Sequence, residues 1–148
     1  MIEKNKENKN STIGSSLLPI LEEYGVDIIF GIPGVHTVEI YRGLHKTSIK
    51  HITPRHEQGA GFMADGYSRV SGKPAVCLVI TGPGLTNILT AMAQARADSI
   101  PMLIISSVNP YDNKRKLSGL LHELPNQQKL LKKIAISSVT VKKINDLL

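Results

Sequence analysis

The chain has 148 residues, of which 41% are hydrophobic and only 4% are aromatic. This length suits a single domain with an aliphatic core, and the lone cysteine, Cys77, excludes both an internal disulfide and a cysteine-only metal cage. Most of the net charge of +6 lies from Tyr111 onward, where eight Lys or Arg outnumber three Asp or Glu. Since no exposed aromatic pattern accompanies these charges, they predict a solvated basic face and no nucleic-acid partner.

The N-terminus and the length of the apolar runs indicate where in the cell the protein is located. No apolar run reaches the roughly 18 residues that a membrane span needs, and Met1–Lys4 have no apolar region of signal-peptide type. These features predict a cytoplasmic protein without a membrane partner. Residues 1–12 are polar and low in complexity, so we expect a disordered tail there and a folded domain at 13–148.

Apolar spacing predicts helices that alternate with strands. Helices are expected at Ser15–Tyr24, Val35–His45, His56–Val70, Pro83–Ala97 and Leu124–Ile134. Strands are expected at Val26–Phe30, Ile49–Thr53, Pro74–Ile80, Met102–Ser106 and Ile136–Val141, with a polar loop at Asn109–Lys116. The third strand is nearly all apolar, which favours a central position. This alternation predicts an α/β, doubly wound, mostly parallel six-stranded sheet with helices on both faces.

Three predicted strand-to-helix turns carry residues suited to a ligand, and such turns share the carboxyl edge of a parallel sheet. Glu57 begins a helix, where it serves either to stabilise the helix dipole or as a functional acid. The turns Gly31–Gly34 and Gly82–Gly84 permit close approach of a phosphate or a flat ligand. Neither turn has the spacing of a dinucleotide loop or the lysine of a P-loop.

The remaining reactive side chains give weaker signals. The five histidines lack metal-ligand spacing, and no metal site is predicted. They are His36, His45, His51, His56 and His122. The serines lack the context of a nucleophile elbow, and Cys77 lies in an apolar strand, where we interpret it as a buried small hydrophobic residue.

Several ordered motifs nevertheless run through the chain. They are Phe30–Gly34, Arg55–Ala60, Ala64–Arg69, Gly72–Pro74, Thr81–Asn87 and Asp98–Pro101. Over residues 13–148 the chain resembles the N-terminal, pyrimidine-binding domain of thiamine-diphosphate enzymes of the acetolactate synthase and 2-oxoacid decarboxylase family.

The resemblance implies that thiamine diphosphate is the cofactor and that Glu57 activates it. In the family this glutamate binds the pyrimidine ring nitrogen and favours the imino form, which removes the thiazolium C2 proton. The other cofactor-binding residues implied by the resemblance are Gly31, Pro33, Gly34, Gly82, Pro83, Gly84 and Asn87.

One position departs from the acetolactate synthase pattern. His122 stands where those enzymes usually carry the glutamine of a Phe-Gln-Glu triplet. It is interpreted either as a catalytic proton donor or acceptor, as in decarboxylases, or as a loop histidine. An acetolactate synthase-like transferase of branched-chain amino acid biosynthesis is therefore the first expectation, and a 2-oxoacid decarboxylase, a lyase, is the second. The third is a non-catalytic remnant or interaction domain.

The chain has no Gly-Asp-Gly motif, which starts the diphosphate-binding domain in the family, so we expect it to lack the family's middle and diphosphate-binding domains. The resemblance implies that Mg2+ is held by a domain outside this chain, and that FAD is an open question for the full enzyme. We therefore expect the chain to be inactive alone and to need a diphosphate-binding domain or subunit. The helices at Gln58–Val70 and Leu85–Ala97 are rich in small residues, so we expect an exposed apolar face and a homo-oligomer, such as a dimer, or a hetero-oligomer.

Overall fold

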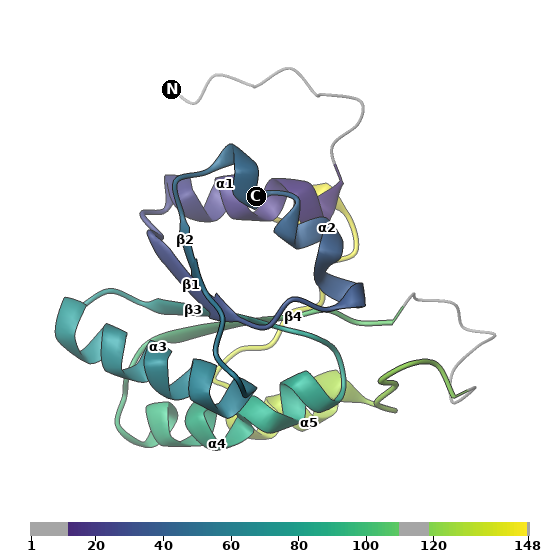
Figure 1. Cartoon of the computed structure of the whole chain (residues 1–148). Helices are drawn as coiled ribbons and strands as arrows, with labels where there is room; N and C mark the ends of the chain where they lie inside the picture. Colours follow the sequence, from purple (N-terminus) through teal and green to yellow (C-terminus); the bar gives the residue numbers. More distant parts are fainter. Residues whose placement is uncertain (1–11, 110–118, 148) are drawn as a thin grey trace.

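The computed structural model describes residues 12–109 and 119–147, which form a parallel sheet of order β2-β1-β3-β4. Its strands are β1 (Ile28–Gly31), β2 (Lys50–Ile52), β3 (Ala75–Val79) and β4 (Met102–Ser106). Helices α1 (Ile13–Glu23) and α2 (Val38–Tyr41) cover one face, and α3 (Glu57–Ser71), α4 (Pro83–Ala97) and α5 (Gln127–Ile134) cover the other (Figure 1). The predicted α/β class, with a parallel sheet between two helical layers, is confirmed.

The predicted number of strands is wrong for the described part of the chain, where the sheet has four strands instead of six. Ile136–Val141 forms no strand. Ile136 is 93% exposed and Val139 is 75% exposed, so the alternating pattern of this segment has no buried face. The Ser138 carbonyl accepts a hydrogen bond from Gln128 Nε2 at 3.2 Å, and a helix side chain thus occupies an acceptor that a neighbouring strand would use.

Other boundaries shift for local reasons. In place of the predicted helix at Val35–His45, the 3₁₀ turns η1 (Val35–Thr37) and η2 (Leu44–Lys46) flank the short α2, and Gly43 lies between α2 and η2. Helix α5 starts three residues later than predicted because the Asn126 side chain caps it. Of the predicted tail, only Thr12 is described, and its hydroxyl caps α1. The remaining tail residues and most of the predicted loop lie outside the described residues.

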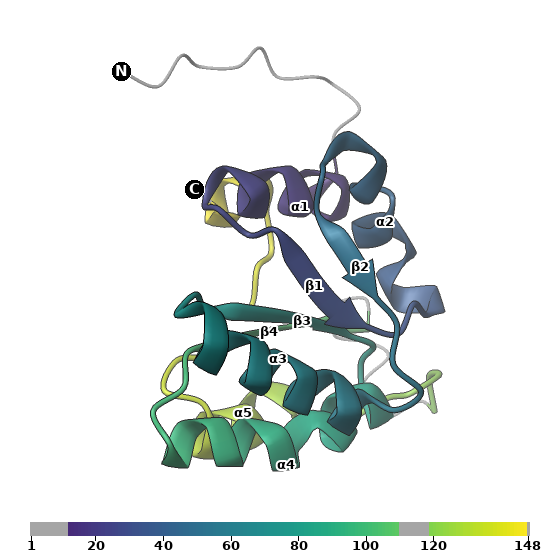
Figure 2. The ribbon, with the colours of Figure 1, turned by 60° about the vertical axis from the view of Figure 1, so that its left-hand side comes forward.

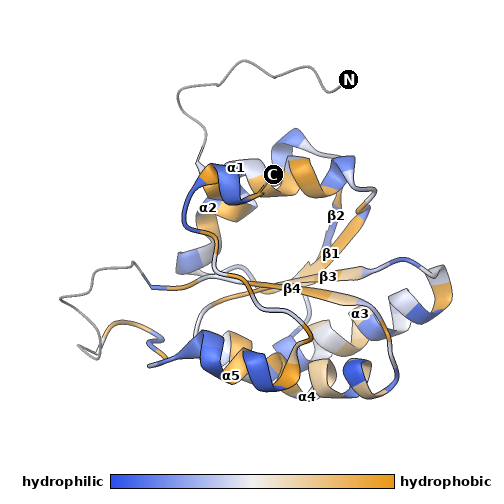
Figure 3. Ribbon diagram, turned by 180° about the vertical axis from the view of Figure 1, so that it is seen from behind, coloured by the Kyte–Doolittle hydropathy of each residue, from blue (hydrophilic) through white to orange (hydrophobic). Residues whose placement is uncertain are grey.

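The core is built on both sides of β3, all five residues of which are buried, as the sequence predicted. Ala75, Cys77 and Val79 pack in the cluster under α3 and α4, whereas Val76 packs with Leu18 of α1. Figure 3 shows β3 and β4 in the hydrophobic colours. None of the helices in the described part is long and apolar enough to cross a membrane.

Cys77 is fully buried in β3, and burial raises the pKa of its thiol to about 12. Because the thiolate is the reactive form, we expect iodoacetamide to leave the native chain unmodified at neutral pH and to modify it once guanidinium has unfolded it. Mass spectrometry of the intact chain measures both states. Rapid modification of the native chain would contradict this burial.

Helices α3 and α4 pack closely through small residues. A Cβ on Gly61 would overlap the Ala91 methyl group and lie 2.9 Å from Ile88 Cγ1. Ala60, Ala64 and Ala91 are buried within this chain, so the prediction that the small residues of these helices face solvent or another subunit is wrong for them. Two larger apolar side chains of α3, Phe62 and Met63, are exposed. The prediction of self-association therefore rests on these side chains.

Two glycines of α3 make a matched test of this contact. We expect Gly61→Ala to lower the free energy of unfolding by about 1–3 kcal/mol, because the added methyl group meets atoms that are already packed. Gly66 has open space at its Cβ position, so Gly66→Ala should raise the free energy of unfolding by about 0.5–1 kcal/mol. Urea unfolding of both variants measures the difference, and equal effects would rule out the close contact.

Candidate functional site

The turns predicted to bind a ligand lie at the carboxyl edge of the sheet. The connection from β1 runs toward β2 on one side, while β3 and β4 extend on the other, which creates a switch point between β1 and β3. Gly31, at the end of β1, is paired with Leu78 of β3. The loops that follow these two strands are therefore neighbours, at the edge toward which the strand arrows point (Figure 2).

Glu57 is the first residue of α3, and its half-buried carboxylate is held by Asn87 of α4. Asn87 Nδ2 donates a hydrogen bond to Glu57 Oε2 at 2.9 Å. The helix dipole favours negative charge at this end, and His56 Nδ1 caps the helix by accepting from the Gln58 amide at 3.1 Å. A carboxylate has about four acceptor positions, so Glu57 keeps capacity for a ligand N–H.

Ile80 lies between the two glycine turns, and sequence reasoning missed its role. A Cβ on Gly34 would be 2.5 Å from Ile80 Cδ1, and a Cβ on Gly84 would be 2.6 Å from Ile80 Cγ2. That added atom on Gly84 would also lie 3.5 Å from Glu57 Oε1. The Ile80 side chain thus fills the space between the two turns. It leaves no room for a Cβ atom at Gly34 or Gly84, so both positions require glycine. The available signal was its position as the last apolar residue before the second turn.

Gly82 adopts a left-handed conformation, with φ of +63°, and the His122 carbonyl packs against it. A Cβ on Gly82 would overlap this carbonyl oxygen. His122 itself has φ of +56°, which is uncommon for a residue other than glycine. The fold therefore brings His122, 40 positions away in sequence, to the second glycine turn.

Gln127 anchors the second turn, and no sequence pattern pointed to it. Its Oε1 accepts from Thr81 Oγ1 at 2.9 Å and from the Gly82 amide at 3.2 Å. Its Nε2 donates to Ser106 Oγ and to the Ser107 carbonyl, each at 3.0 Å. A single side chain on α5 thus ties the turn to the end of β4.

Three predicted residues occupy different settings. Gly31 supports the sheet, because a Cβ there would overlap the Leu78 carbonyl. Its own carbonyl oxygen lies 3.1 Å from His51 Nε2. Pro33 is exposed on the loop after β1 and Pro83 is exposed as the first residue of α4, which leaves both prolines accessible to a ligand.

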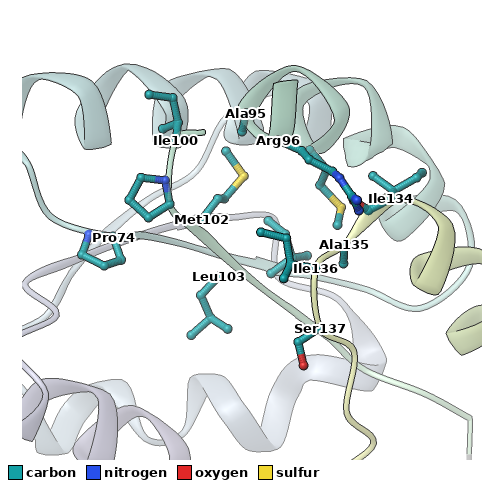
Figure 4. Close-up of a pocket in the computed structure, with 13 residues that line it drawn as sticks. Pro74, Ala95, Arg96, Ile100, Met102, Leu103, Ile134, Ala135, Ile136 and Ser137 are labelled. Atoms are coloured by element: carbon teal, nitrogen blue, oxygen red, sulfur yellow. The ribbon is translucent and has the colours of Figure 1, made fainter. Parts of the chain in front are cut away.

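A cavity of about 330 Å³ lies elsewhere, at the amino end of β4 (Figure 4). Its lining is mostly apolar and includes Pro74, Met102, Leu103 and Ile136. Because the strands are parallel, this end is opposite the edge that carries Glu57. Within residues 12–109 and 119–147, no group of three or more His, Cys, Asp or Glu is placed to hold a metal ion.

The fold and this edge define a parallel α/β domain with glycine turns and one anchored carboxylate at its switch point. Comparison with known families shows to which family this domain belongs. Residues 11–130 match the family described as thiamine pyrophosphate enzyme, N-terminal TPP binding domain, and the chain belongs to this family. The resemblance found in the sequence is confirmed.

Individual relatives cover most of the chain. It is 61% identical over 120 residues to a probable 2-ketoarginine decarboxylase of Pseudomonas aeruginosa, which covers 81% of this chain and 22% of the relative. It is 48% identical over 103 residues to the large subunit of acetolactate synthase isozyme 1 of Escherichia coli, covering 69% of this chain and 18% of the relative. The mitochondrial acetolactate synthase catalytic subunit of Saccharomyces cerevisiae is 44% identical over 100 residues, covering 67% of this chain and 15% of the relative. The chain thus spans about a fifth of the length of these relatives.

Proposed function

We propose that this chain is the pyrimidine-binding part of a thiamine-diphosphate enzyme that decarboxylates 2-oxoacids. The observation that carries the proposal is the Glu57 carboxylate, anchored by Asn87 beside Gly84 at the switch point of the sheet. This position combines an anionic acceptor with backbone that lacks side chains. Both features suit a flat ring that presents nitrogen atoms.

The residues present fit the cofactor. When bound, thiamine diphosphate supplies the electron sink for loss of CO₂. In our proposal Glu57 would accept a hydrogen bond from a pyrimidine ring nitrogen and share its proton, while Asn87 holds the carboxylate in place. Glu57 lies at the amino end of α3, where the helix dipole is positive. The exposed Pro33 and Pro83 would flank the ring, and Gly34 and Gly84 would let it approach the backbone.

The rest of the cofactor needs another domain. We propose that the diphosphate and Mg2+ are held by a domain or subunit outside this chain, which completes the site. Whether FAD belongs to the complete enzyme depends on that remainder. The exposed Phe62 and Met63 on α3 support an oligomer in which such a face is covered.

Two observations favour a decarboxylase over a carboligase. His122 replaces the glutamine of acetolactate synthases and lies against Gly82 at the proposed site. The relative with 61% identity is named a probable 2-ketoarginine decarboxylase, which makes 2-ketoarginine our first candidate substrate. Acetolactate synthase is the second candidate function, supported by relatives with 48% and 44% identity. This order reverses the expectation from sequence alone.

Calorimetric titration with thiamine diphosphate and Mg2+ tests the proposal. The chain is titrated alone and together with a chain that carries a diphosphate-binding domain, and CO₂ release from 2-oxoacids is followed in parallel. We expect binding and turnover only in the combined sample, with release of CO₂ from 2-ketoarginine. Absence of binding in both samples would refute the proposal, and formation of acetolactate from pyruvate would select the second candidate.

A further inference from the structure

Three buried side-chain atoms at the carboxyl edge have no hydrogen-bond partner. Within the described residues these are His36 Nδ1, Asn109 Oδ1 and His122 Nδ1. They come from three segments: η1 after β1, the loop after β4, and the turn against Gly82. A buried polar atom left unpaired costs about 1–3 kcal/mol, and native proteins contain few of them. Three at one edge therefore require an explanation.

The three residues form a connected cluster, which we call the His-Asn cluster. The rings of His36 and His122 meet edge to face, with centroids 6.1 Å apart and planes inclined by 67°. Asn109 Nδ2 donates to the carbonyl of Leu121, the residue before His122, at 3.3 Å. Since Gly82 packs on the His122 carbonyl, the cluster borders the second glycine turn.

The chemistry of these atoms indicates what they bind. Because the Asn109 amide nitrogen points to a carbonyl, its orphaned atom is the oxygen, which only accepts hydrogen bonds. A neutral imidazole with its proton on Nε2 also presents an acceptor at Nδ1. With both histidines in this tautomer, all three orphaned atoms are acceptors, and such a set matches a group rich in donors. A guanidinium has five N–H donors and no acceptor, whereas a carboxylate would oppose the Asn109 oxygen.

We propose that His36, Asn109 and His122 recognise the guanidinium end of a 2-oxoacid substrate. This inference rests on the proposed function, since it places the substrate side chain beside the cofactor turns. In this arrangement the cluster is satisfied only by a donor-bearing side chain, and an apolar one leaves its acceptors unpaired. A site of that kind discriminates strongly against analogues that lack the donors.

Ring and amide NMR of the full 148-residue chain tests the cluster directly, because NMR detects millimolar binding. The chain, labelled with ¹⁵N in its His and Asn side chains, is titrated with 2-ketoarginine, with uncharged 2-oxohexanoate and with acidic 2-oxoadipate. We expect 2-ketoarginine alone to shift the signals of His36, His122 and Asn109. The variant His36→Phe keeps the ring shape and should weaken binding about tenfold, which corresponds to one lost hydrogen bond to a charged group. His45→Phe, at an exposed histidine of η2, is the matched control.

Two results would overturn the inference: equal responses to all three acids or to none, and unchanged binding in His36→Phe. The proposed function is tested separately, because thiamine diphosphate binding in the combined sample does not depend on the substrate side chain. Cofactor binding with no preference for 2-ketoarginine would remove this inference and keep the proposed function. A preference for 2-ketoarginine without cofactor binding would keep a guanidinium-binding cluster and remove both the proposed function and the role of the cluster in recognising a substrate.

Discussion

Replacing Glu57 with Gln is expected to lower 2-oxoacid turnover about a thousandfold in the chain combined with a diphosphate-binding domain. Gln preserves the length of the side chain and can still accept from Asn87 Nδ2, so the local fold should persist. It cannot share a proton with the cofactor as a carboxylate does. Steady-state kinetics measure the loss, and circular dichroism measures whether the fold is retained.

The matched control is Glu23→Gln, which removes an exposed carboxylate at the end of α1, on the other face of the sheet. We expect its turnover to equal that of the unmodified chain. If Glu57→Gln retained full turnover while the cofactor was bound, Glu57 would be a helix-terminal charge and nothing more. The helix-dipole interpretation of this residue would then be the correct one.

Replacing Gly82 with Ala is expected to lower the free energy of unfolding by about 2–3 kcal/mol. Two effects add at this position. Its φ of +63° is unfavourable for any residue with a Cβ, and the new atom would overlap the His122 carbonyl oxygen. The turn must open to relieve the overlap, so thiamine diphosphate binding should weaken as well. Chemical denaturation and calorimetry measure the two losses.

Gly25→Ala isolates the backbone effect. Gly25 has φ of +84°, but the position of its Cβ is open space. Its loss should be about 1 kcal/mol, the cost of the left-handed conformation alone. If Gly82→Ala also lowered the free energy of unfolding by only about 1 kcal/mol, the turn carrying His122 would be free to move away from the added methyl group. His122 would then not be held at the site.

Local sequence was sufficient for the regular elements because their signals are short-range. Helix α4 runs from Pro83 to Ala97 as predicted, since proline suits the first helical turn and the apolar spacing continues without a break. Strand β4 also has its predicted bounds. The segment Ile136–Val141 carries an equally good strand pattern, but a strand exists only where a neighbour supplies hydrogen bonds. There the Gln128 side chain takes the Ser138 carbonyl instead.

By itself, the sequence determined the α/β class, the family and the candidate residues Glu57 and Asn87, because motif spacing and periodicity are properties of the chain alone. Tertiary structure decided how these residues meet. The wedge of Ile80 between Gly34 and Gly84 depends on which strands are neighbours in the sheet. Likewise, the contact between His36 and His122 joins η1 to a turn 86 positions later in the sequence. No local preference encodes such contacts, since they arise only when the strand order brings the carboxyl ends of the sheet together.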